Sequence, residues 1–303
     1  MFKFAIKRVM IAVPVLMMVV LMIFFMLNVI PGDPITVMMK EHIKPAVIEN
    51  LRQKMHLDDP FFVKYAKYIG GMLQGDLGIS YKLSRPVVDL IKTAFPNTLK
   101  LAISAALVSW LIGIPAGILS AVKKNSAADR LFMSFALFGI SMPVFWIGLM
   151  LQNLCKGFLP ISGLTTWQHY ILPSIVLGWS SAGNIARLTR SNLLEIMKLD
   201  YIRTARAKGR LELGVVLMHG LKNALLPVIT MMAIQVAGLL SGAVITETIF
   251  SINGIGRLSV SAIQTRDMPL LQGTVIFTTV IIILGNMVAD ILYSVIDPRI
   301  RLQ

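Results

Sequence analysis

The most chemically distinctive stretch of the chain is the basic segment YIRTARAKGR, residues 201–210. It carries four cations and no acidic residue: Arg203, Arg206, Lys208 and Arg210. In a soluble protein such a cluster is typical of a nucleic-acid site. Here 56% of residues are hydrophobic and only 15% are charged, whereas about a quarter are charged in soluble domains. The composition indicates an integral membrane protein, whose cytoplasmic loops are rich in Lys and Arg, and we expect no nucleic-acid partner.

Metal and redox chemistry find little support in the residues that could perform them. The single cysteine, Cys155, excludes an internal disulfide and a cysteine cluster. The four histidines lie in different segments, without H-E-x-x-H spacing: His42, His56, His169 and His219. The 19 methionines could suit Cu(I), but apolar filling is their commoner role. The sequence predicts no metal site, no bound cofactor and no catalytic residue.

ATP chemistry is also missing from the sequence. None of the 303 residues form a G-x-x-x-x-G-K-S/T phosphate loop. If ATP drives a process here, another polypeptide must bind the nucleotide and its Mg²⁺.

Two acidic residues in apolar surroundings are candidates for a transport pathway. Glu247 lies near the outer end of the fifth apolar segment and Asp290 near the inner end of the sixth. A charge in the bilayer is costly and commonly faces water or the bundle interior. The two do not form a chain of carboxylates across the membrane, so a proton-coupled mechanism finds little support.

Six apolar segments must position these residues, and all six are predicted to be helices because unpaired backbone groups are too costly in hydrocarbon. Gly113-x-x-x-Gly117 in the second segment would allow close helix packing, and the fourth segment is the weakest, with Pro173, Gly178 and Gly183 inside it. The segments are about 9–30, 98–122, 131–154, 171–187, 225–249 and 271–292.

The distribution of positive charge predicts the orientation of these spans. Lys and Arg concentrate in the segments that would be internal if the N-terminus is cytoplasmic, in line with the positive-inside rule. Both termini are then cytoplasmic. The long outer segment after the first span would hold short amphipathic helices at 45–55, 61–72 and 84–95, which predicts a small helical extracytoplasmic cap.

The inner loop between the fourth and fifth spans is predicted to contain two short helices. Asp200 could cap the first, which would end at Gly209, and a second over 214–226 would stop at Pro227. A loop with its own helices and small residues is typical of a docking element. The alternative is a basic surface that lies on anionic membrane lipid.

The motifs of this loop resemble the cytoplasmic signature loop of ABC-importer permeases. The matching residues are TARAKG (204–209), His219, Asn223-Ala224 and Pro227. The nearest branch is the B-type membrane subunit of dipeptide, oligopeptide, glutathione and nickel importers. Further matching stretches lie along nearly the whole chain: PGDP (31–34), GDLG (75–78), WQHYILPS (167–174), ETIFSINGIGRL (247–258) and DPRIR (297–301).

The resemblance implies an all-α permease subunit in a bacterial inner membrane, multi-pass and non-catalytic. Residues 1–93 would form the first span and the outer segment. Residues 94–294 would form the type I core with the other five spans, and residues 295–303 would form a cytoplasmic tail. The partners implied are a homologous second permease, two cytoplasmic ATPases that bind ATP and Mg²⁺, and an extracytoplasmic binding protein. The cargo would be a peptide, or a related solute such as glutathione or a nickel chelate. By carry-over, the 201–227 loop couples to the ATPases through Arg203, Thr204, Ala205, Arg206, Ala207, Lys208, Gly209, His219, Asn223 and Pro227.

The chain departs from the general family pattern in the length of the interval from Gly209 to Pro227, which is longer here, and at the start of the signature. Arg203-Thr204-Ala205 stand where the broad pattern has Glu-Ala-Ala, as in the peptide and nickel branch. The alternatives of a different class are a self-sufficient secondary transporter or channel, weakened by the lack of an internal repeat, and an intramembrane enzyme, for which no constellation of residues is present.

Overall fold

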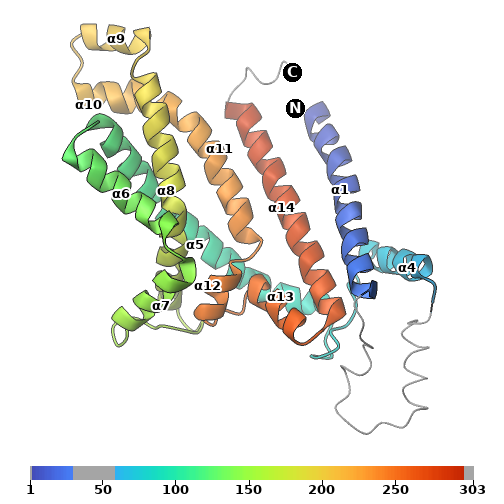
Figure 1. The fold of residues 1–303 in the computed structure, drawn as a ribbon. Coiled ribbons are helices and arrows are strands. Elements are labelled where there is room, and N and C mark those ends of the chain that lie inside the picture. The colour runs from blue at the N-terminus through green and yellow to red at the C-terminus, as the bar shows by residue number, and fades with distance from the viewer. Residues whose placement is uncertain (1, 30–58, 297–303) are drawn as a thin grey trace.

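The computed structural model describes residues 2–29 and 59–296, with side chains described for 10–26 and 59–291. Within these ranges every regular element is helical, and β pairing is limited to two isolated bridges. The predicted helix at 45–55, the PGDP and DPRIR motifs, His42 and His56 lie outside the described residues. The elements (Figure 1) are α1 (Phe2–Val29), α4 (Phe61–Leu73), α5 (Val87–Val122), α6 (Ala127–Ser141), α7 (Val144–Leu154), a 3₁₀ turn (Trp167–Tyr170), α8 (Ile171–Ile196), α9 (Asp200–Ala207), α10 (Glu212–Gly214), a π-helical turn (Val215–Gly220), α11 (Leu221–Leu240), α12 (Val244–Ile249), α13 (Ile255–Gln264) and α14 (Met268–Ile296).

Helix α5 joins two segments that the sequence analysis treats as separate. It has 36 residues, about 54 Å at 1.5 Å per residue, and includes residues 87–95 of the predicted outer helix 84–95 together with the whole second span 98–122. Pro96 lies inside it and is exposed, so the one backbone hydrogen bond it removes does not end the helix. The outer helix is therefore an extension of the span rather than an independent element.

The predicted third span, 131–154, is wrong as a single helix. The chain bends by 105° between α6 and α7. Met142 has φ −89° and ψ 138°, an extended conformation, because the residue before a proline is driven out of the helical region. Pro143 then starts the shorter α7.

The fourth segment is longer and more regular than predicted. Helix α8 continues to Ile196 instead of stopping at 187. Pro173 lies in its first turn, where a missing N–H costs no helical hydrogen bond. Gly178 and Gly183 do not break the helix but bring backbones together: a Cβ at Gly178 would lie 2.7 Å from the Ala105 carbonyl oxygen.

The close packing predicted for Gly113-x-x-x-Gly117 is confirmed, and the partner is α8. A Cβ at Gly113 would lie 2.7 Å from the carbonyl oxygen of Ala182, and one at Gly117 would lie 2.6 Å from that of Ala186. Because both residue numbers increase together, α5 and α8 run parallel in contact over several turns.

The fifth predicted span, 225–249, is also divided. Helix α11 ends at Leu240, Gly242 takes a left-handed φ of +111°, and α12 begins at Val244. Glu247 therefore lies on a short separate helix and not on a span. The sixth segment agrees with α14.

Helices α1 and α4 form a side group beside the rest of the bundle. Helix α1 packs against α14 (Figure 1). The predicted outer helix near 61–72 is confirmed as α4, and its rings of Phe61 and Tyr65 lie 5.3 and 5.4 Å from the ring of Phe24 on α1. The neighbouring Phe62 is exposed.

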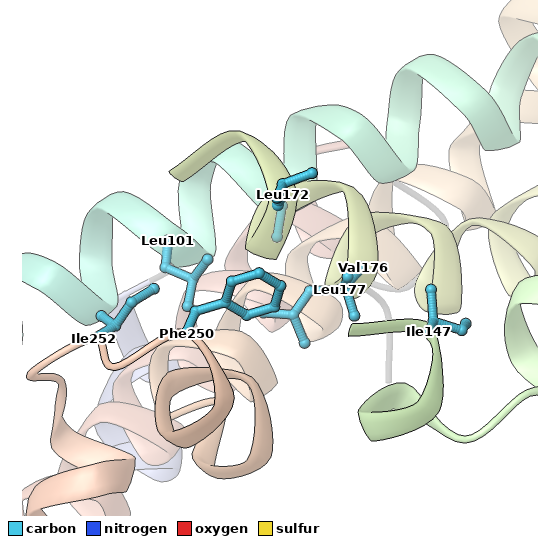
Figure 2. Packing of buried hydrophobic residues seen from close by; sticks show 8 residues of the cluster. Leu101, Ile147, Leu172, Val176, Leu177, Phe250 and Ile252 are labelled. Carbon is cyan, nitrogen blue, oxygen red and sulfur yellow. The ribbon is translucent and has the colours of Figure 1, made fainter. Parts of the chain in front are cut away.

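A hydrophobic core surrounds Phe250 where α5, α7, α8 and α12 meet. Its ring is buried among Leu101, Leu172, Leu177 and Ile252 (Figure 2). Opposite this core, α9 and α10 project from the other end of the bundle, the end at which α1 begins and α14 finishes (Figure 1).

By length and composition, three helices of the described residues can cross a membrane, or four if the bent α6–α7 pair crosses as one span. They are 87–122, 212–240 and 268–291, and α1 adds a shorter apolar stretch, Met10–Met26. The count of six spans stays a prediction.

Candidate functional site

Helix α9 forms the tip of the inner loop. Leu199 and not Asp200 occupies its N-cap, so the predicted Asp200 cap is wrong, while the predicted end near Gly209 is confirmed. Gly209 has φ +76°, and no atom lies within 4 Å of the position that a Cβ would take there. Glycine is favoured because the left-handed conformation is costly for other residues, and not because of crowding.

One ion pair joins α9 to α10. The Arg206 guanidinium donates from Nε to Glu212 Oε2 at 3.0 Å and from Nη2 to Oε1 at 2.6 Å. This bidentate geometry fixes orientation, although both side chains are well exposed and the pair adds little stability. Of the other cations, Arg203 reaches Asp200 at 3.3 Å.

Tyr201 connects α9 to the predicted residues that follow it. Its hydroxyl accepts from Asn223 Nδ2 at 2.8 Å and lies 3.4 Å from the carbonyl oxygen of His219. The structure thus brings His219 and Asn223 to the base of α9 through a residue to which the sequence analysis assigned no role.

The base of the loop is packed into the bundle. Ile202, on the inner side of α9, is fully buried, as is Val215 in the π-helical turn. Val216 clusters with Leu193 and Ala224. The loop is therefore anchored by buried apolar side chains to the ends of α8 and α11.

Pro227 does not stop a short second helix, contrary to the prediction for 214–226. Helix α11 continues through Pro227 to Leu240. The first part of that predicted helix, 215–220, is instead the π-helical turn, a geometry found often at functional sites.

Three large apolar side chains of the loop are exposed. Leu211 is 84% exposed, Leu213 68% and Met218 64%, and the two leucines flank Glu212 in the sequence. No role was predicted for these three residues, although leucines on both sides of Glu212 in a basic loop are a usable signal.

Glu247 is enclosed by protein and joins three helices. Its Oε1 accepts from Thr98 Oγ1 at 2.8 Å and its Oε2 from the backbone N–H of Arg257 at 2.9 Å. Thr98 Oγ1 in turn accepts from the Ile255 N–H at 2.8 Å. Burial raises the pKa of the Glu247 carboxyl above its ordinary value.

Asp290 lies far from Glu247. It is half-buried, 22 residues after the start of α14 at Met268, which is about 33 Å along the helix. The structure does not bring the two carboxylates together, and a pathway role for either stays a prediction.

Two family models match this sequence. The family described as "Binding-protein-dependent transport system inner membrane component" matches residues 113–302, and its N-terminal companion, "Binding-prot-dependent transport system membrane comp, N-term", matches residues 1–102. The chain belongs to this permease family.

Curated relatives match the permease over its full length. The glutathione transport system permease protein GsiC of Escherichia coli strain K12 is 41% identical over 304 residues, covering 99% of each chain. GsiC of Salmonella paratyphi A has the same identity and coverage.

Solved structures support the fold of the permease. A chain of the MetNI methionine ABC transporter, in an inward-facing conformation, has a TM-score of 0.59 at 17% identity and covers 69% of this chain and 96% of its own. A chain of an amino acid ABC transporter crystallised with histidines has a TM-score of 0.52 at 16% identity.

The permease is therefore an inner-membrane, multi-pass subunit of an ATP-driven ABC importer of the peptide and glutathione branch, with the type I permease fold. It is non-catalytic, because in this family the ATPase work is done by partner chains. A partner permease, ATPase chains and a binding protein belong to such a system in general. Family membership decides against a self-sufficient transporter or channel.

Proposed function

We propose that this permease subunit imports small peptides, with glutathione as the first cargo to test. The observation that carries the proposal is the 41% identity to glutathione permeases along 99% of both chains. Glutathione is itself a tripeptide, so a dipeptide or oligopeptide is the related alternative. The similarity runs through the outer segment as well as the core, which favours a shared transport task over a shared scaffold alone.

The cytoplasmic loop 201–227 is our candidate for the contact with the ATPases. A docking element must be stiff enough to transmit motion and must offer apolar surface for burial in its partner. The bidentate Arg206–Glu212 pair and the buried Ile202 support the first requirement, and exposed Leu211 and Leu213 support the second. Rigid-body motion of the ATPases would then move the spans.

The assembly that we propose has four parts besides the cargo. A homologous second permease would complete the pathway, two ATPase subunits would bind ATP and Mg²⁺ on the cytoplasmic side, and a binding protein would deliver cargo to the outer cap. Both termini of this chain would be cytoplasmic, and 1–93, 94–294 and 295–303 would be its outer-segment, core and tail regions.

An uptake assay tests the cargo. Cells that lack the permease gene and their complemented counterparts are given radiolabelled glutathione or dialanine, each with a tenfold excess of unlabelled nickel chelate as a competitor. We expect glutathione uptake that depends on the permease and resists the chelate. Uptake of dialanine alone would move the assignment to dipeptides, and competition by the chelate would contradict a peptide cargo.

Co-purification tests the contact. Leu211→Glu places a charge on the loop, and Leu73→Glu makes the same change at a leucine that is 79% exposed at the end of α4. We expect Leu211→Glu to lose most of the bound ATPase and of the uptake, while Leu73→Glu keeps its ATPase. Equal ATPase recovery with the two variants would contradict docking through this loop.

A further inference from the structure

Helix α8 carries an uninterrupted polar stripe that the coupling loop does not explain. Its members recur at steps of three or four residues, so they share one helix face. Three of them, Asn184, Arg187 and Ser191, are exposed in the middle and inner turns of the helix. The full stripe is Ser180, Asn184, Arg187, Ser191 and Glu195.

The opposite face of α8 is apolar and buried, which fixes the direction of the stripe. Ala182, Ile185 and Leu193 are at most 1% exposed, and the helix packs against α5 and α6. The stripe therefore faces away from the subunit's own core.

The stripe lies at membrane depth. Leu101 and Leu172 belong to one core cluster, and Ala121 and Leu193 belong to another. The 20 residues from Leu101 to Ala121 on α5 span about 30 Å, the thickness of a bilayer's hydrocarbon core.

Contacts with α5 place two members of the stripe within that span. A Cβ at Gly113 would touch Ala182 and Ile185, which brackets Asn184 about 18 Å from the Leu101 level. A Cβ at Gly117 would touch Ala186 and Thr189, which brackets Arg187 in the inner half.

Lipid is an unfavourable neighbour for these side chains. Within the described residues, Arg187 has no carboxylate at ion-pair distance and Asn184 makes no side-chain hydrogen bond. An unpaired guanidinium and a free amide in hydrocarbon cost several kcal/mol each, by the order of magnitude of unpaired polar groups. The exposed positions of α5 over this depth are all apolar, for example Leu111 at 74% exposed.

We propose that this stripe of α8 lines the aqueous pathway and that the Arg187 guanidinium receives the carboxylate of the passing solute. A guanidinium binds carboxylates through two parallel hydrogen bonds, and the neighbouring amide and hydroxyls suit a peptide backbone. Peptides and glutathione both carry a free carboxylate. The inference rests on the proposed import function and specifies the chemistry of its pathway.

Cysteine labelling tests whether the stripe meets water. With Cys155→Ser as background, the only cysteine is removed, and Asn184→Cys is compared with Leu111→Cys, an exposed position at the same depth. The assembled transporter is placed in sealed vesicles of both orientations and treated with membrane-impermeant methanethiosulfonate reagents. We expect Asn184→Cys to be labelled at least tenfold faster than Leu111→Cys. Equal rates, or no labelling of Asn184→Cys from either side, would overturn the proposal.

Reagent charge tests the role of Arg187 without a transport assay. The rate of a negatively charged sulfonate reagent at Asn184→Cys is divided by that of a positively charged ammonium reagent, relative to a free thiol. Residues three apart on a helix are about 5–6 Å apart, and one charge at that distance in water changes each rate about threefold. The corrected ratio should be about tenfold in favour of the anion and should fall to about one with Arg187→Gln. A ratio unaffected by Arg187→Gln would overturn the assignment of Arg187.

The labelling requires no ATP, so its failure is distinguishable from failure of the coupling proposal. Absent labelling in a complex that retains its ATPases would overturn only the pathway stripe. Normal labelling together with unchanged ATPase recovery for Leu211→Glu would overturn only the docking loop.

Discussion

Arg190 on α8 holds Asp129 on α6 through two parallel hydrogen bonds, from Nε to Oδ1 at 3.0 Å and from Nη2 to Oδ2 at 2.8 Å. The same carboxylate accepts from the Asn125 N–H at 2.9 Å and from the hydroxyl of Ser120 on α5. The Asp129 side chain is only 7% exposed. One carboxylate thus fixes α5, α6 and α8 to one another at the end of the bundle that carries the loop.

Removing either partner of this pair should destabilise the permease strongly. Asp129→Ala leaves Arg190 unpaired in a mostly buried site and should lower the unfolding free energy by about 3–5 kcal/mol. Thermal unfolding in detergent measures the loss. The double variant Asp129→Ala/Arg190→Ala should lose less than the sum of the single variants, and a fully additive result would contradict coupling between them.

Adding one methyl group at the α5–α8 contact should also be costly. Gly113→Ala would place its Cβ 2.7 Å from the Ala182 carbonyl oxygen, and overpacking of this kind costs about 1–3 kcal/mol. Gly238→Ala on α11 is the matched control, because no atom lies within 4 Å of its Cβ position. The control should be neutral or slightly stabilising. A melting temperature equally affected in both variants would contradict the importance of the contact.

The left-handed backbone at Gly209 can be tested by a similar pair. Gly209→Val forces a β-branched residue to φ +76° and should distort the end of α9, at a cost on the order of 1–2 kcal/mol. Gly214→Ala, on α10 with open space around it, should be tolerated. We expect a several-fold loss of transport-coupled ATP hydrolysis only for Gly209→Val, and full coupling in that variant would show that the shape of the helix end is unimportant.

Exchanging the charges of Arg206 and Glu212 tests whether this pair holds the loop in shape or contacts the ATPase directly. Arg206→Glu places two carboxylates face to face and should loosen the loop, with a several-fold fall in ATPase co-purification. If the pair acts by holding α9 to α10, then Arg206→Glu/Glu212→Arg should restore most of the recovery. A double variant as poor as the single one would indicate that the Arg206 guanidinium itself binds the partner.

Glu247 predicts a dependence of stability on pH. Since burial raises the pKa of its carboxyl above 4.5, the folded state holds the proton more tightly than the unfolded state. The resulting stabilisation is full below pH 4.5 and is lost as the pH rises through the folded pKa. Glu247→Gln lacks this titration. As the pH rises from 4.5 to neutrality, the unfolding midpoint of the wild-type protein should therefore fall relative to that of Glu247→Gln. A difference that stays constant over this interval would refute the raised pKa.

Local patterns predicted the helices, but not where they bend or join. Proline has two outcomes in this chain, and sequence alone does not separate them: Pro143 forms a 105° break, whereas Pro227 lies inside a continuous helix. The difference depends on tertiary packing, as it does at Gly178, which the sequence presents as a breaker and the structure uses as a contact with Ala105.

The candidate loop was recognisable because its residues carry a family motif, whereas its internal contacts were not. Nothing in the order of residues pairs Arg206 with Glu212 or Tyr201 with Asn223, since these contacts arise only when α9 folds back on the π-helical turn. The polar stripe of α8, by contrast, follows from a 3.6-residue period. Pro173, Gly178 and Gly183 in the same segment indicate a broken helix and so obscure this periodicity.

The glycine-lined contact between α5 and α8 has a mechanical consequence. Packed side chains can shift relative to one another, whereas backbones in direct contact cannot. We therefore expect α5 and α8 to move together as one rigid unit. Only residues 197–199 separate this rigid unit from α9. A small push on α9 would therefore act at one end of a lever about 39 Å long, the length of the 26-residue α8, and would be delivered to the core around Phe250 at the other end.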